Sequence, residues 1–195
     1  MDLKGKKIGL AMTGSFCTFS TVIDQARELL KRGAEIVPIM SFNSYEMNTR
    51  FGTAEDFINI IEDLSGRKVI NTIQDAEPIG PKHLTDIMLV APCSGNTISK
   101  IANNVIDTPV TMAIKSHLRN EGPVVIAVST NDGLAASAEN IGKILNRKHF
   151  YFVPFKQDNP ITKPRSLVFD ANCLVKAIEE AFEGHQMQPI ITWIF

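Results

Sequence analysis

The stretch VAPCSGNTISKIAN, residues 90–103, joins an apolar run to a helix-like segment through a long polar turn. Its first residues are typical of the end of a buried strand, whereas Asn96 and Thr97 are typical of the start of a helix. Six residues, Pro92 to Thr97, lie where about two or three would make the turn. One interpretation is helix capping. The other is that the turn holds a small polar ligand that carries a phosphate.

On both sides of this turn, short apolar runs alternate with helical patterns along the chain. We expect strands at 7–12, 35–41, 86–92, 123–129 and 149–155, and a short extra strand at 68–73. We expect helices at 19–30, 57–64, 98–105, 109–120, 134–148 and 167–184, and a loop at 74–84. Strands separated by helices predict an α/β fold with a doubly wound, Rossmann-like parallel sheet flanked by helices in three layers.

Composition narrows the class of protein. The 195 residues suit one domain, and 44% hydrophobic with 21% charged residues is normal for a globular protein. The net charge of −1 and the absence of a basic stripe argue against nucleic acid as a partner. The first apolar run is too short for a signal peptide or a membrane span. The three cysteines suggest no disulfide framework and fit a reducing cytosol, and the four histidines show no metal-ligand spacing.

The last nine residues, MQPIITWIF (187–195), form an apolar tail after the domain expected at 1–186. The tail contains Trp193 and Phe195 and has no charged residue. Because an exposed apolar segment usually marks an interface, we predict that the tail packs against another subunit. The alternative is that it folds back onto its own sheet or helices.

Four polar loops follow predicted strands, at 13–18, 41–44, 92–97 and 129–133. The carboxyl ends of parallel strands meet at one edge of a sheet, which is where such folds bind ligands. Glycines and hydroxyl residues at helix starts suit a phosphate, although each loop alone is also explained by ordinary capping. The first loop has neither a G-x-G-x-x-G nor a G-K-[S/T] motif, which favours a mononucleotide-type ligand over NAD(P) or ATP.

The strings PCSGNTISKIANNVID (92–107), HLRNEGPVVIAVS (117–129) and AENIGKIL (138–145) resemble the FMN-binding flavoproteins that include the cysteine decarboxylases and the flavin prenyltransferases. The resemblance implies a flavoprotein-type fold, a homo-oligomer and FMN as a possible cofactor. It places seven residues against FMN: Gly14, Ser15, Ser41, Ser94, Gly95, Asn96 and Thr97.

The chain departs from this family at the residues that carry its known activities. The His-Ile pair of the decarboxylases is replaced by Pro78-Ile79. The Arg-Glu-Thr-Pro segment of the prenyltransferases reads Ser-Thr-Asn-Asp at 129–132, and their Tyr-x-Arg-Pro segment reads Ile-Thr-Lys-Pro at 161–164. These replacements argue against a decarboxylase or prenyltransferase that acts alone.

Three longer strings, MTGSFCTF (12–19), EPIGPKHLTDIMLVAPCSGNT (77–97) and VPFKQDNPITKPRSL (153–167), are similar to one branch of the family. Its members are subunits of two-subunit oxidoreductases from spore-forming bacteria. The resemblance implies oxidation of a dihydrodipicolinate-type precursor to pyridine-2,6-dicarboxylate in the mother-cell cytoplasm, with NADP on the partner subunit. It identifies no catalytic residue.

Two cations are candidates for binding the dicarboxylate. Lys163 and Arg165 flank Pro164 in a segment expected near the mouth of the site, where Arg binds a carboxylate with two hydrogen bonds. A solvated basic loop is the alternative. A non-catalytic scaffold subunit that has lost its flavin also stays open as a function.

Overall fold

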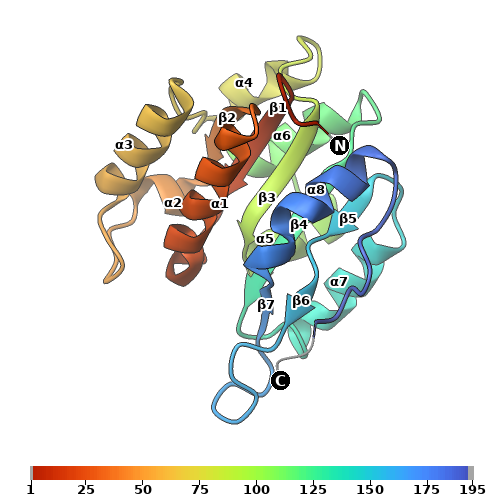
Figure 1. Cartoon of the computed structure of the whole chain (residues 1–195). Coiled ribbons are helices and arrows are strands. Elements are labelled where there is room, and N and C mark those ends of the chain that lie inside the picture. Colours follow the sequence, from red (N-terminus) through yellow and green to blue (C-terminus); the bar gives the residue numbers. More distant parts are fainter. Residues whose placement is uncertain (1, 193–195) are drawn as a thin grey trace.

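The computed structural model describes residues 2–192 and shows a mixed sheet between two layers of helices (Figure 1). The strands are β1 (Lys7–Met12), β2 (Glu35–Met40), β3 (Ile87–Cys93), β4 (Val124–Thr130), β5 (Phe150–Phe152), β6 (Phe155–Lys156) and β7 (Leu167–Phe169). The helices are α1 (Phe19–Lys31), α2 (Phe42–Glu46), α3 (Ala54–Ser65), α4 (Ile73–Ala76), α5 (Gly95–Ala102), α6 (Pro109–Leu118), α7 (Ala136–Leu145) and α8 (Leu174–Phe182).

The first five strands pair in parallel in the order β2-β1-β3-β4-β5, which confirms the doubly wound α/β class. Two short strands extend this sheet in the antiparallel sense. β7 pairs with the carboxyl end of β4, where Ser129 lies opposite Val168, and β6 pairs with β7. The chain end thus covers the edge of β4 beyond the point where β5 stops.

Four predicted elements differ from the structure. The strand expected at 149–155 is divided into β5 and β6, which pair with different strands. The last helix does not begin at 167, because Leu167 and Phe169 are buried while Val168 between them is partly exposed, which is the alternation of a strand. The expected strand at 68–73 is reduced to a single bridge between Ile70 and Ile39. The expected loop at 74–84 contains most of α4 and a 3-10 turn at Glu77–Ile79.

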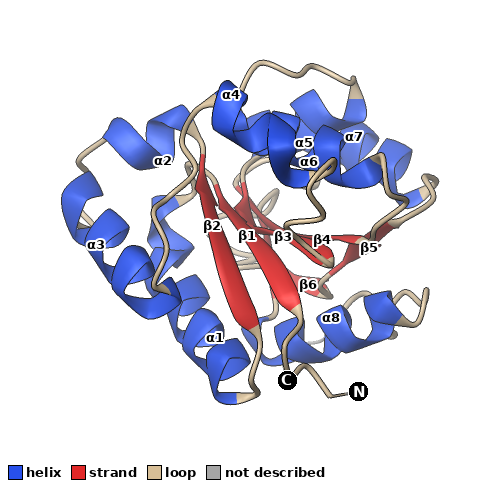
Figure 2. Ribbon diagram, turned by 90° about the horizontal axis from the view of Figure 1, so that it is seen from above, coloured by secondary structure: helices blue, strands red, loops and turns tan. Residues whose placement is uncertain are grey.

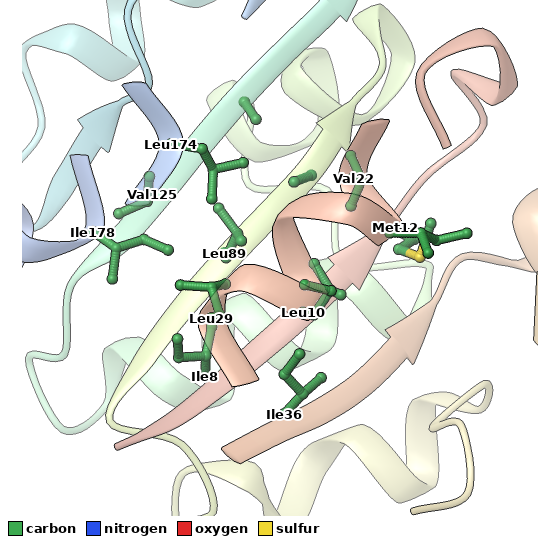
Figure 3. Packing of buried hydrophobic residues seen from close by; sticks show 14 of the residues in the cluster. Ile8, Leu10, Met12, Val22, Leu29, Ile36, Leu89, Val125, Leu174 and Ile178 are labelled. Carbon is green, nitrogen blue, oxygen red and sulfur yellow. The ribbon is translucent and has the colours of Figure 1, made fainter. Parts of the chain in front are cut away.

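Helices cover both faces of the sheet (Figure 2). Helices α1, α3 and α8 lie on one face, and α4 to α7 lie on the other. Strand β1 shows why the strands read as continuous apolar runs: Ile8 and Leu10 pack against α1, whereas Ala11 belongs to the core of the opposite face (Figure 3). A strand buried on both sides has no polar face.

Local signals fix where the helices begin and end. Thr53 starts α3 with a capping box that includes Asp56, and Gly66 ends it at a φ of 64°, in the left-handed region. Thr108 forms a second capping box, and Pro109 occupies the first turn of α6. Within the described part of the chain, none of the helices has the length and apolarity needed to cross a membrane.

The described part of the tail lies along β6 of its own chain. Phe155 N donates to Ile190 O at 3.0 Å, and Thr192 N donates to Phe155 O at 3.1 Å. Ile191 remains 53% exposed. Residues 193–195, with Trp193 and Phe195, lie outside the described residues, so the contact of the tail with another subunit stays a prediction.

Candidate functional site

The order of the strands places a crevice between the carboxyl ends of β1 and β3, because the chain leaves these two neighbouring strands in opposite directions. Thr13, the first residue after β1, is fully buried at this point. Its Oγ1 donates to Pro92 O at 2.7 Å and accepts from Ser94 N at 2.9 Å. A single hydroxyl therefore fastens the first loop to the third, a role that the sequence did not reveal.

Ser94 and Thr97 form the start of α5. Ser94 Oγ accepts from Thr97 N at 3.3 Å, and the two hydroxyls lie 3.0 Å apart. Ser94 is therefore the N-cap of α5, and the hydroxyl of Thr97 contacts that of Ser94. Asn96 is exposed, and its side chain has no hydrogen bond within residues 2–192. The amide of Asn96 and the first backbone N–H groups of α5 are thus the donors that this helix start offers to a ligand.

Gly95 is required by the loop that follows β4. A Cβ at this position would lie 2.7 Å from Thr130 Oγ1 and 2.9 Å from both Asp132 Oδ1 and Ser137 Oγ. These three groups form one network, because Asp132 Oδ1 accepts from Thr130 Oγ1 at 2.5 Å and from Ser137 Oγ at 2.8 Å. Because Gly95 has no side chain, the third and fourth loops can pack together.

The first and fourth loops are also joined. Ser15 Oγ donates to Ser129 O at 2.6 Å, and Thr18 Oγ1 donates to Ser15 O at 3.0 Å. The hydroxyl of Ser15 is therefore already engaged within the protein. A ligand at this loop would meet it only as an acceptor.

The second loop lies beside the first. Ser41 is buried and caps α2 by accepting from Ser44 N at 3.4 Å. A Cβ on Gly14 would lie 3.7 Å from Asn43 Cβ and 3.8 Å from Phe16 Cε2, which are ordinary contacts, so the first and second loops pack against each other at this glycine. All four loops thus meet at the carboxyl edge of the sheet, as the sequence predicts. The role of their residues in binding FMN stays a prediction.

The loop between β6 and β7 brings Lys163 and Arg165 to the same edge. Leu134 N donates to Arg165 O at 2.9 Å, so this loop leans on the one that follows β4. A hydrogen bond and an ion pair with Asp158 raise the pKa of Lys163. Smaller effects come from Cys17, which raises this pKa, and from Arg50, which lowers it. The pKa of Lys163 therefore responds to a residue of the first loop and to a residue of the turn before α3.

Two cavities lie away from these loops. One of about 290 Å³ lies where α5, α6 and α7 approach the start of β5, and includes Ile114 and Arg147 in its wall. The other, of about 230 Å³, is lined by Lys7 and Ile70 among others. Neither contains a residue of the four loops, so the candidate site is a surface formed by loops rather than either cavity.

Two polar side chains, those of Cys93 and His117, are buried in the core. Burial raises the pKa of the Cys93 thiol. His117 is 2% exposed, with Nδ1 at 2.8 Å from Thr85 Oγ1 and Nε2 at 3.1 Å from Pro123 O. Among residues 2–192 no group of His, Cys, Asp and Glu is arranged to hold a metal ion.

Comparison with known proteins places this fold and site in a family. Residues 1–171 match the family model described as Flavoprotein, and the chain belongs to that family. Over 190 residues it is 45% identical to the B subunit of dipicolinate synthase of Bacillus subtilis (strain 168), covering 97% of this chain and 95% of that protein.

Solved structures agree with this assignment. The crystal structure of the B subunit of dipicolinate synthase from Bacillus halodurans matches with a TM-score of 0.91 and 40% identity over 100% of both chains. DmrB of Burkholderia xenovorans, solved in complex with FMN, matches with a TM-score of 0.68 and 16% identity over 91% of this chain and 96% of that one. The second likeness is one of fold alone.

Proposed function

We propose that this chain is the B subunit of a dipicolinate synthase, and that it acts with an A subunit in the mother-cell cytoplasm of a sporulating bacterium. The similarity to such a subunit over nearly the whole of both chains carries this proposal. The reaction removes two electrons and two protons from a dihydrodipicolinate-type precursor. A hydride passes to NADP on the A subunit, one proton is released, and the ring becomes the aromatic pyridine-2,6-dicarboxylate.

The donors at the four loops support FMN as a cofactor of this chain. An FMN phosphate needs N–H and hydroxyl donors. The Asn96 amide and the first N–H groups of α5 supply such donors. FMN, when bound, would supply a two-electron carrier between the substrate and NADP.

The substrate requires positive charge at the same edge. Lys163 and Arg165 are exposed on the loop between β6 and β7, and the Arg165 side chain has no ion pair within the described chain. Two carboxylates on one small ring would attract these cations strongly. In this proposal they bind and orient the substrate.

Asn96 offers a test of the FMN site that spares the fold. Asn96→Asp adds a negative charge to the first turn of α5, where it favours the helix but repels a phosphate. We expect unchanged or higher thermal stability and FMN binding weakened by at least about tenfold, measured by flavin fluorescence titration. Asn96→Ala separates the loss of the amide from the added charge. Equal FMN affinity of the parent and the Asp variant would contradict the assignment.

Activity is tested with both subunits together. We expect formation of pyridine-2,6-dicarboxylate, coupled to reduction of NADP, only when this chain is mixed with the A subunit. Turnover by this chain alone at the rate of the mixture would overturn the two-subunit proposal.

A non-catalytic scaffold is the second candidate function. The hydroxyls of Ser15, Ser94 and Thr97 are engaged with other protein groups, as expected if they only hold the loops. In addition, Pro78 lies in a 3-10 turn whose Ile79 is buried, where the decarboxylases carry their His-Ile pair. Full activity of the two-subunit mixture without any flavin would favour this candidate.

A further inference from the structure

The cavity of about 290 Å³ lies on the face of the sheet that α4 to α7 cover. Helix α5 contacts both α6 and α7 on this face (Figure 2). Phe150, the first residue of β5, belongs to the cavity wall, whereas the four loops follow the carboxyl ends of the strands. Because α5 begins at the candidate site and ends at this cavity, about 12 Å of helix separates the two. The cavity is therefore distinct from the site formed by the loops.

The wall of this cavity is largely apolar. Its apolar members are Ile101, Ile106, Ile114, Leu118 and Phe150. Thr111 also belongs to the wall, but its hydroxyl is already engaged with that of Thr108 at 2.9 Å. A cavity of about 150 Å³ holds one benzene molecule, so the larger volume here accepts one aromatic ring with a short substituent. A ring in this position would cover apolar surface that otherwise faces water.

Two cations share the wall with these apolar residues. Lys115 of α6 is exposed, and its ammonium group has no hydrogen bond or ion pair within residues 2–192. Arg147 is fixed in place: its Nη1 donates to Ile101 O at 2.9 Å and its Nη2 to Ala102 O at 2.6 Å. Nη1 also donates to Asn104 Oδ1 at 3.2 Å. These bonds use three of the five N–H donors of the guanidinium group, and all three acceptors are uncharged.

No carboxylate balances these two charges in the wall of the cavity. Helices α5 and α6 contain no acidic residue. Asp107 follows Ile106 of the wall, but its Oδ2 is paired with Lys100 Nζ at 2.6 Å. On α7, Glu139 Oε1 is paired with Lys143 Nζ at 2.8 Å. An apolar cavity with positive charge and no acid in its wall complements a ligand with an apolar body and one anionic end.

We propose that this cavity binds a small aromatic monocarboxylate. The ring lies against the apolar wall, and Lys115 together with the open N–H groups of Arg147 stabilises the carboxylate. The site is separate from the one proposed for FMN and for the dicarboxylate, so it depends neither on that cofactor nor on turnover.

The test varies the ring and the charge of the probe separately. Binding of 3-phenylpropanoate, of the neutral 3-phenylpropanamide and of acetate to the full chain is measured by ligand-observed NMR titration. We expect the phenylpropanoate to bind about 10- to 100-fold more tightly than the amide, the effect of one hydrogen-bonded charge. Acetate, which has no ring, should not bind at the same concentrations. A parent that does not bind the phenylpropanoate, or that binds the amide equally well, overturns the proposal.

Two variants place the probe in the cavity. Lys115→Gln removes a charge at an exposed position and should weaken phenylpropanoate binding by about tenfold while leaving the amide unchanged. Leu118→Trp fills the cavity and should weaken both aromatic probes. Lys31→Gln, at an exposed position of α1 on the opposite face, is the matched control and should change neither.

Thermal unfolding shows whether each variant folds, and the Lys115 variant decides the outcome if the tryptophan variant does not. A folded Lys115→Gln variant that keeps the preference for the carboxylate overturns the proposal. So does a parent that binds no probe while Leu118→Trp changes the particle mass in light scattering, since a second copy of the chain would then cover this face.

Discussion

Replacing Thr13 by Val tests whether one buried hydroxyl holds the candidate site together. Valine keeps the shape of threonine but can neither donate to Pro92 O nor accept from Ser94 N, the two partners that Thr13 Oγ1 binds at 2.7 and 2.9 Å. Both partners belong to the turn between β3 and α5, and Thr13 is 0% exposed. The hydrogen bond to Pro92 O is buried and the one from Ser94 N is partly buried, so Pro92 O in particular would lose its partner away from water.

The expected cost follows from those two groups. A buried polar group without a hydrogen bond costs about 1–3 kcal/mol, so two of them cost about 2–6 kcal/mol of the free energy of unfolding. With a urea dependence of about 2 kcal/mol per M, the midpoint of unfolding should fall by about 1–3 M. FMN affinity should also fall, because the first and third loops lose their common anchor.

Thr13→Ser is the matched control, since it keeps the hydroxyl and removes only a methyl group. It should cost about 1 kcal/mol. Urea unfolding followed by circular dichroism measures both variants, and flavin fluorescence titration measures the affinity. A valine variant that is as stable as the parent, or more stable than the serine variant, would refute the anchoring role of the hydroxyl.

Two further predictions concern stability. Burial lowers the pKa of His117, so the unfolded chain binds a proton more readily; stability should fall as the pH drops below about 6.5, the ordinary value. Urea titrations at several pH values give the free energy of unfolding as a function of pH. His117→Gln should lose the part of this pH dependence that comes from His117, whereas His185→Gln, at an exposed position, should retain it. Gly95→Ala should cost about 1–3 kcal/mol through its clash with Thr130 and Asp132. Gly142 lies in α7 with no atom within 4 Å of the position that a Cβ would take, so Gly142→Ala should raise the free energy of unfolding by about 0.5–1 kcal/mol. Thermal unfolding measures both glycine variants, and equal effects of Gly95→Ala and Gly142→Ala would contradict the packing argument.

The central sheet could be predicted from the sequence because its strands are buried on both faces. A run such as that of β3 is apolar throughout, and the helices between the strands have clear caps. The short strand β7 could not be found in this way. It has three residues, and its alternation is visible only once Leu167 and Phe169 are known to be buried. The antiparallel pairs at the end of β4 depend on tertiary contacts that no local pattern records.

The candidate site, like the sheet, could be predicted from the sequence only in part. The four loops are recognisable because each follows a strand and is rich in glycine or hydroxyl residues. Thr13 was missed because its role depends on a contact with a residue 79 positions away in the chain. The resemblance places Gly95 against FMN, and the structure adds that a Cβ at this position would meet Thr130 and Asp132.

The charges at the site indicate how the work would be divided between two subunits in the proposed reaction. The ion pair with Asp158 keeps Lys163 protonated by raising its pKa, and an arginine is protonated at any physiological pH. Lys163 and Arg165 can therefore bind and orient carboxylates but cannot accept the proton that aromatisation releases. Removing Lys163 should accordingly raise KM more than it lowers kcat. A chain that holds the substrate and a partner that accepts the hydride would each be inactive alone.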